Sequence, residues 1–104
     1  MKEKKITFYG RFESDILKGL KTITIRNRLE SHYSKGEILN VYRYEDNVFF
    51  CTIEIDDVST IDYNQLNDNH AKQENMTLDQ LKEVINNIYP GEQSLYVLSF
   101  HLVN

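Results

Sequence analysis

The fold is decided by the stretch Gly19-Leu20-Lys21-Thr22-Ile23-Thr24-Ile25-Arg26, which joins a helical pattern to a strand pattern. Gly19 stands where a helix would need a residue of positive φ in order to end. The run that follows alternates polar and apolar side chains with a period of two, as a half-buried strand does. Ile23 and Ile25 therefore face the core, and Thr24 and Arg26 face a cleft on the opposite side of the strand.

Lys21 can join that cleft only if the backbone before the strand is irregular. An odd separation places Lys21 and Thr24 on opposite faces of a regular strand. The alternating run favours a strand over a helix, so the helical alternative is poor. We therefore predict that residues 19–21 form a turn and that the strand begins near Thr22. In that arrangement the Lys21 nitrogen lies close to the Thr24 hydroxyl, and a direct contact between the two requires roughly 3 Å.

The remaining pattern predicts an α+β domain spanning residues 1–104. The predicted elements are a strand at Ile6–Tyr9, a short helix from Phe12 to Gly19, the strand from Thr22, paired strands at Ile38–Tyr44 and Val48–Val58, a helix from Thr77 to Ile88 and a last strand at Ser94–Val103. Residues 61–75 are polar and carry no predicted element. About five short strands in 104 residues favour a small, strongly curved sheet or partly closed β-barrel with helices at its mouths.

The charge distribution and the cysteine content disfavour several classes of function. The first 52 residues hold ten Lys and Arg against seven Asp and Glu, and the other 52 hold two against nine. The negative net charge of the chain disfavours non-specific binding along DNA. The positively charged first half can still attract a single anionic group. Cys51 is the only cysteine and is expected in the core of a strand; no metal-ligand spacing is present. The chain opens without an apolar segment, which favours a cytoplasmic location and no membrane contact.

Residue type alone does not single out a catalytic site. Lys21, Arg26 and Glu74 would be ordinary surface or ion-paired side chains, and Thr24 an ordinary strand residue. Glycine-rich phosphate loops and serine-elbow motifs are absent from the sequence. From the residues themselves we predict only a small soluble domain with a polar cleft above the strand that carries Thr24.

A family resemblance makes the prediction sharper. The spacing Gly19-x-Lys21-x-x-x-x-Arg26 matches the signature of the ASCH superfamily, whose fold is a PUA-like β-barrel. Further matches to the small bacterial ASCH proteins that are N(4)-acetylcytidine amidohydrolases are Ile6-Thr-Phe, Arg11-Phe, Asp15-Ile-Leu, Ser31-His32, Phe50-Cys-Thr-Ile-Glu54, His70-Ala-Lys-Gln-Glu-Asn-Met-Thr-Leu78 and Ile88-Tyr-Pro-Gly91. The resemblance covers roughly residues 5 to 102.

The resemblance implies an amide hydrolysis without metal or cofactor. It assigns Lys21 as proton acceptor, Thr24 as nucleophile and Glu74 as proton donor, and Arg26 is expected to bind the substrate. The partner is then a small acetylated cytosine nucleoside. A pyrimidine amine is a better leaving group than an alkyl amine, because the ring delocalises the departing charge. A lysine acts as a base only where burial or a neighbouring cation favours its neutral form, and Arg26 is the nearest cation in the sequence.

A non-catalytic RNA-binding module is the alternative, because PUA-like barrels also bind RNA. The basic first half supports it, as do aromatic side chains that could stack on bases, namely Tyr33, Tyr42, Tyr44 and Phe49. Weak contact with RNA is left open beside the enzyme function. Also open are the form of the substrate (base, nucleoside, nucleotide or RNA), the choice between an acyl-threonine and direct water attack, and the oligomeric state.

Overall fold

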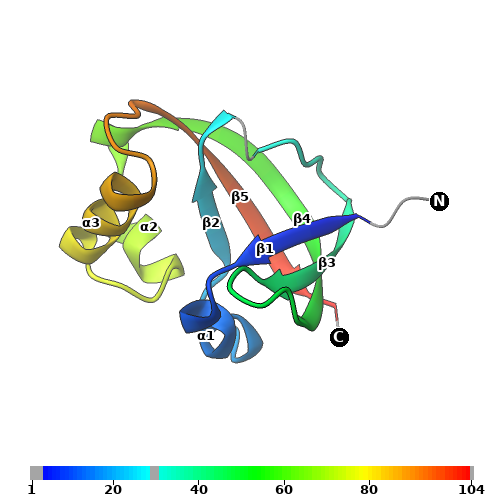
Figure 1. Cartoon of the computed structure of the whole chain (residues 1–104). Helices are drawn as coiled ribbons and strands as arrows, with labels where there is room; N and C mark the ends of the chain where they lie inside the picture. The colour runs from blue at the N-terminus through cyan, green and yellow to red at the C-terminus, as the bar shows by residue number, and fades with distance from the viewer. Residues whose placement is uncertain (1–3, 29–30, 104) are drawn as a thin grey trace.

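The frame of the molecule is a five-stranded mixed sheet (Figure 1). The computed structural model describes residues 4–28 and 31–103. In chain order its elements are β1 (Lys5–Phe8), the 3₁₀ turn η1 (Gly10–Phe12), α1 (Glu13–Leu17), β2 (Ile23–Arg26), β3 (Ile38–Arg43), β4 (Phe49–Asp62), η3 (Tyr63–Gln65), α2 (Asp68–Gln73), α3 (Leu78–Ile88) and β5 (Ser94–Leu102). The α+β class is therefore confirmed.

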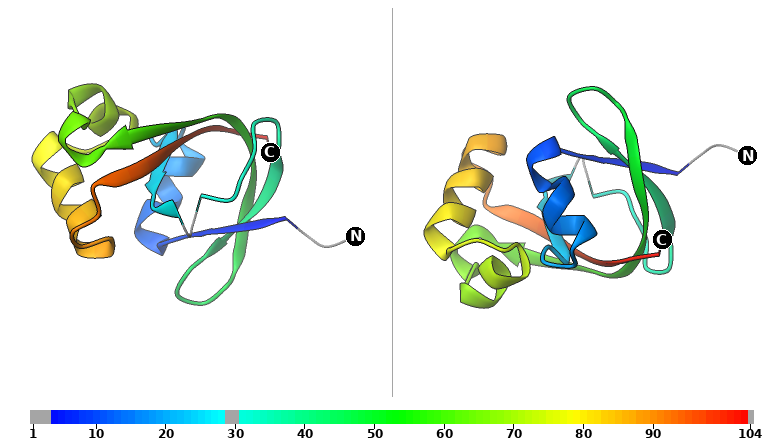
Figure 2. Two further views of the ribbon diagram at one scale, coloured as in Figure 1. Left: turned by 90° about the horizontal axis from the view of Figure 1, so that it is seen from above. Right: turned by 90° about the horizontal axis from the view of Figure 1, so that it is seen from below.

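The strands lie in the order β1-β3-β4-β5-β2, and the sheet is open. The pair β1–β3 is parallel, and the other three pairs are antiparallel. The long strands β4 and β5 are curved, and α2 and α3 lie together at one end of the sheet (Figure 2). Of the two expected forms, a partly closed barrel was preferred over a curved sheet, but the sheet does not close: β1 and β2 remain as its two edges.

Two groups of buried side chains form the core. In the first, the β3–β4 hairpin contributes Leu39, Val41, Cys51, Ile53 and Ile55, which pack with residues of β1, α1 and β5. In the second, β2 and β5 pack against the apolar side of α3. Cys51 is buried in the first group, as expected. Since β5 supplies residues to both groups, both of its faces are buried, and no simple alternation of apolar side chains marks it.

Helix α1 ends as the sequence predicts. Gly19 has φ of +75°, its N–H donates to the carbonyl of Ile16 (3.1 Å), and the Leu20 N–H donates to the carbonyl of Asp15 (2.8 Å). This pair of hydrogen bonds is the Schellman motif of helix C-termini. The Lys21 N–H also donates to Asp15, at 3.1 Å, so residues 19–22 lie outside regular structure and β2 begins at Ile23.

Two features differ from the sequence prediction. Strand β4 continues four residues past Val58 to Asp62, because β5 pairs with it as far as Ser94. Helix α2 occupies part of the segment that carried no predicted element. Only Ala71 of its six residues is buried, so it has no apolar stripe to reveal it. Its stability comes from capping: the Asn67 side chain accepts hydrogen bonds from the N–H groups of Asn69 and His70.

Candidate active site

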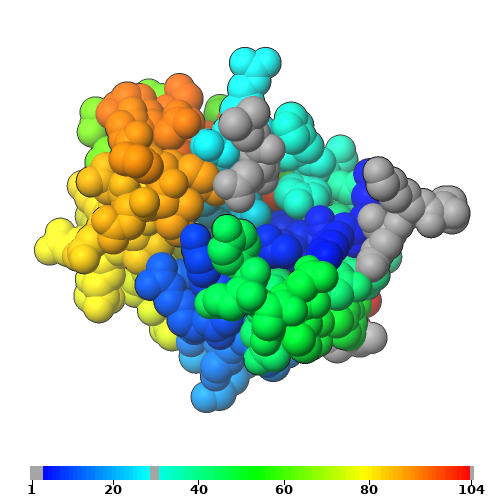
Figure 3. Space-filling view, viewed as in Figure 1, coloured from blue at the N-terminus to red at the C-terminus, as the bar shows by residue number. Residues whose placement is uncertain are grey.

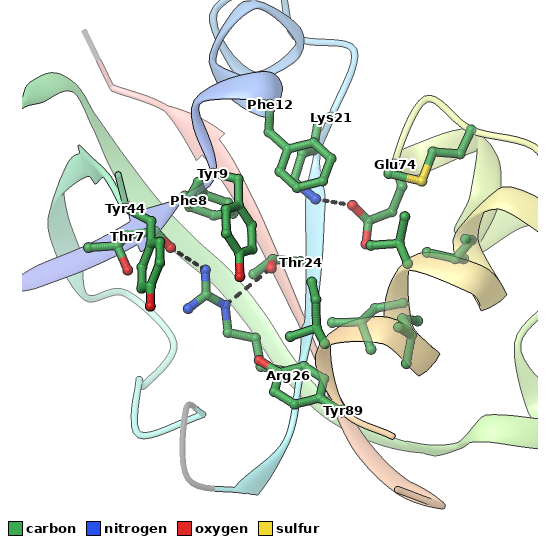
Figure 4. A pocket seen from close by; sticks show the side chains of 16 residues that line it. Thr7, Phe8, Tyr9, Phe12, Lys21, Thr24, Arg26, Tyr44, Glu74 and Tyr89 are labelled. Atoms are coloured by element: carbon green, nitrogen blue, oxygen red, sulfur yellow. Dashed lines mark hydrogen bonds and ion pairs between the residues drawn. The ribbon is translucent and has the colours of Figure 1, made fainter. Parts of the chain in front are cut away.

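A single cavity of about 270 Å³ collects all four predicted site residues. Strand β2 forms its floor, the β1–η1 segment one wall and helix α3 the other (Figure 4). The four side chains are nearly inaccessible: the exposed fractions are 3% for Lys21, 4% for Glu74, 6% for Thr24 and 7% for Arg26. Their residue types alone suggest surface positions, so this burial is the first sign of function.

Lys21 enters the cavity because the backbone before β2 is irregular. The carbonyl of Gln73 accepts a hydrogen bond from the Thr22 N–H (2.8 Å), which fixes this segment against the end of α2. The Lys21 ammonium donates to the carbonyl of Ile23 at 2.9 Å and to Oε1 of Glu74. It also lies 4.9 Å from the centre of the Phe12 ring. The predicted turn at residues 19–21 is confirmed.

The pKa of Lys21 is held well below its usual range. Burial is the main cause, because it disfavours the charged ammonium, and the positive charge of Arg26 is the next. Asp15 opposes the shift. A lysine in this environment approaches the neutral form that a general base requires.

Glu74 is placed by the end of α2. It is the C-cap residue, and Asn75 follows with φ of +58°, in the left-handed region. The N–H of Asn75 donates to Lys72 (3.0 Å) and the N–H of Met76 to Ala71 (2.9 Å), which again is a Schellman motif. The Asn75 side chain also donates to Asp15 Oδ1 at 3.2 Å. The ends of α1 and α2 are thus joined, and this junction brings Lys21 and Glu74 together.

Arg26 connects the floor of the cavity to its wall. Its Nε donates to Thr24 Oγ1 at 3.2 Å, and its Nη2 donates to the carbonyl of Thr7 in β1 at 2.7 Å. The guanidinium carbon lies 4.8 Å from the centre of the Phe8 ring. Arg26 therefore fixes the Thr24 hydroxyl and spans the opening between the two edge strands.

One expected contact is absent. The hydrogen bonds of the Lys21 ammonium to described residues go to Ile23 and Glu74, whereas the Thr24 hydroxyl is bonded to Arg26. The prediction of a direct Lys21–Thr24 contact is therefore wrong for this state of the protein. Both side chains nevertheless line the same cavity. A proton can pass between them after a rotation of the Lys21 side chain or through one water molecule.

Several cavity residues were not singled out by the sequence. Tyr9 lies in the wall beside Phe8 and Phe12, and Asp15 supports the floor through its backbone and carboxylate. Aromatic residues beside a glycine break at Gly10 gave a weak signal of a cavity wall. Asp15 appeared only within the Asp15-Ile-Leu match of the family resemblance, because the partner of its carboxylate, Asn75, is 60 positions away in the sequence.

The aromatic residues considered for RNA stacking do not form one surface. Tyr44 lines the cavity. Tyr42 and Phe49 pack against each other with ring centres 5.7 Å apart, and the Tyr33 hydroxyl donates to the carbonyl of Lys5 at 3.1 Å.

Other candidate sites are not indicated in the described ranges. Residues 4–28 and 31–103 contain no group of three or more His, Cys, Asp or Glu side chains that could hold a metal ion. Burial and the charge of Glu13 raise the pKa of the Cys51 thiol to about 11, which makes it a poor nucleophile near neutral pH. No helix in this part of the chain is long and apolar enough to cross a membrane.

Comparison with known proteins identifies the family. A model of the ASCH domain matches residues 4–102. The chain belongs to the ASCH domain family. Among solved structures, an ASCH domain from Lactobacillus crispatus JV V101 superposes with a TM-score of 0.81 at 20% identity, covering 96% of this chain and 80% of that one. An ASCH protein from Zymomonas mobilis gives a TM-score of 0.76 at 16% identity, covering 96% and 67%. At these identities, the likeness shows the fold.

Relatives of higher identity carry a functional name. An N(4)-acetylcytidine amidohydrolase of Haemophilus influenzae (strain 86-028NP) is 56% identical over 99% of this ASCH chain and 99% of its own length. A protein of the same name from Klebsiella pneumoniae subsp. pneumoniae is 53% identical over 96% of this chain and 97% of its own. These ASCH proteins align with the present chain from end to end, so the similarity includes every part of the cavity.

Proposed function

We propose that this ASCH protein hydrolyses N(4)-acetylcytidine to cytidine and acetate. Thr24 acts as nucleophile, Lys21 as proton acceptor and Glu74 as proton donor. The names of the relatives support the substrate, and the buried contact between Lys21 and Glu74 supports the roles proposed for these two residues.

The Lys21–Glu74 pair supplies an acid and a base from one proton. Two neutral groups lose less hydration on burial than two ions, and both side chains are almost fully buried. With the proton on Glu74, Lys21 is a neutral amine and Glu74 a neutral carboxylic acid. These are the protonation states that a proton acceptor and a proton donor need before the reaction starts.

The steps follow from those states. Lys21 takes the hydroxyl proton of Thr24 while the Thr24 oxygen bonds to the acetyl carbon. When the C–N bond breaks, Glu74 gives its proton to the exocyclic nitrogen of cytosine, and cytidine leaves. A water molecule then attacks the acetyl-threonine and gives up a proton to the Glu74 carboxylate. The Lys21 ammonium returns its proton to the Thr24 oxygen as acetic acid leaves, and the acid loses its remaining proton to solvent to give acetate.

Arg26 is the proposed substrate-binding cation. Its Nε–H already donates to Thr24 Oγ1, so it stabilises negative charge that develops on that oxygen. Its guanidinium also lines the cavity, where the acetyl oxygen would accept a hydrogen bond as it becomes an oxyanion. Removing one such donor in other enzymes costs about 100- to 1,000-fold in kcat.

Acetate release from purified protein tests the proposal. N(4)-acetylcytosine, N(4)-acetylcytidine and acetylated RNA are supplied separately, and free acetate is followed. We expect release from the nucleoside, none from Thr24→Ala, and partial retention in Thr24→Ser, which keeps a hydroxyl. A Thr24→Ala protein with wild-type turnover would instead support direct water attack. Absence of acetate from all three substrates would refute the proposed function.

A further inference from the structure

Two tyrosines form an aromatic surface on one wall of the cavity. Tyr9 follows β1, and Tyr44 follows β3; their ring centres are 5.1 Å apart and the rings are tilted by 57°. Both line the cavity (Figure 4). Tyr44 is 64% exposed, in contrast to the buried residues of the floor. A large aromatic side chain is therefore held at the cavity mouth without being covered by the protein.

The backbone holds this tyrosine pair firmly in place. The Tyr44 N–H donates to the carbonyl of Phe8 at 2.8 Å. The next residue, Glu45, accepts from the Gly10 N–H at 2.8 and 3.2 Å through its two carboxylate oxygens. The β3–β4 hairpin is thus fastened to the corner between β1 and η1. These two segments meet helix α3 on one face of the molecule (Figure 3).

The opposite wall of the cavity is aliphatic. Val84, Ile85 and Ile88 of α3 line the cavity. Figure 4 shows this helix on the other side of the polar floor from Tyr9 and Tyr44. A planar heteroaromatic ring suits this arrangement, because one of its faces can stack on an aromatic ring while the other contacts aliphatic groups. An acyl group attached to that ring would then reach Thr24 on the floor.

We propose that Tyr9 and Tyr44 form the surface on which the pyrimidine ring of the substrate stacks, and that this pair selects acylated aminopyrimidines over aliphatic amides. The inference rests on the proposed function and adds to it the residues that determine specificity. It also explains why Tyr44 remains exposed: the stacking surface must be free before the substrate arrives.

Substitution of each tyrosine by leucine tests the stacking surface. Stacking on an aromatic side chain contributes about 1–3 kcal/mol per base, which corresponds to roughly 5- to 150-fold in affinity. Tyr9→Leu and Tyr44→Leu should raise the KM for N(4)-acetylcytidine and the Kd of the product cytidine within this range. Tyr9→Phe should stay within about twofold, because it keeps the ring. Phe49→Leu is the matched control: this residue of β4 is 48% exposed but does not line the cavity.

The two readouts separate this inference from the proposed function. Cytidine binding is measured by calorimetry and turnover by acetate release, and thermal unfolding shows that each variant is folded. If the leucine variants bind cytidine as tightly as the wild type does, the inferred stacking surface is wrong, regardless of their rate of acetate release. If the wild-type protein binds cytidine through the tyrosines but releases no acetate, the stacking surface is supported and the proposed hydrolase activity is refuted. Wild-type protein that neither binds cytidine nor releases acetate refutes both.

Discussion

Glu74→Gln should make the stability of the domain depend strongly on pH. The substitution keeps the shape of the side chain and removes its ability to exchange a proton with Lys21. Lys21 remains 3% exposed, and burial together with Arg26 already holds its pKa well below the usual range. In the variant, the buried amine must stay neutral or become an unpaired buried cation, and both states are unfavourable relative to the unfolded chain at neutral pH.

The sign and size of the effect follow from proton counting. In the wild type, the Lys21–Glu74 pair holds one proton near neutrality in the folded and unfolded chain alike, so it adds little pH dependence. In Glu74→Gln, the unfolded lysine binds a proton below its ordinary pKa of about 10.4, whereas burial makes the folded lysine bind it only at a lower pH. The free energy of unfolding therefore falls as pH decreases, by about 1.4 kcal/mol per pH unit. From pH 10 to pH 7 the loss reaches at most about 4 kcal/mol.

Urea unfolding followed by far-ultraviolet circular dichroism at pH 7, 8, 9 and 10 measures this loss. The quantity compared is the difference between variant and wild type, in which the titration of the remaining groups cancels. The double variant Lys21→Met/Glu74→Gln is the control, because it removes the titrating amine and should show a flat difference. If the Glu74→Gln difference were also flat, burial would not lower the pKa of Lys21 in the folded variant, and the proposed neutral lysine base would lose its support.

Three further predictions concern cofactors, RNA and the turn. Acetate release should be unchanged by EDTA, because no metal-binding cluster lies in the described ranges; loss of activity that zinc restores would contradict this. Affinity for unmodified single-stranded RNA should be weak and unselective at physiological salt, since the chain carries a net charge of −4; a tight complex that survives added salt, without acetate release, would favour the RNA-binding alternative. Gly19→Ala should lower the free energy of unfolding by about 1–2 kcal/mol, because φ is +75° at this residue. If both Tm and kcat fall in this variant, the turn positions Lys21.

The sequence predicted those parts of the site that depend on local backbone geometry. An odd separation between Lys21 and Thr24, with a glycine before them, required a turn followed by a strand, and both are present. Burial of Ile23 and Ile25 followed from the same alternation. These predictions succeeded because short-range sterics decide them.

The missing parts depend on contacts between distant segments. By residue type Lys21 was expected to be an ordinary surface or ion-paired side chain, but it is buried against Glu74, so Lys21→Ala should lower stability. Helix α2 escaped prediction because capping by Asn67, rather than an apolar stripe, stabilises it. The Tyr9–Tyr44 contact joins residues 35 positions apart and exists only because β1 and β3 are paired in parallel.

The opening between β1 and β2 also bears on self-association. Unpaired sheet edges are the usual places where strands of separate molecules join, and they lead to aggregation. Here each of the two edge strands has a strand neighbour on one side only, and both supply residues to the same cavity. On β1, the Thr7 carbonyl that an incoming strand would use accepts a hydrogen bond from Arg26. Arg26, which fixes the Thr24 hydroxyl, thus also occupies one of the hydrogen-bonding positions that an incoming strand would need on the free edge of β1.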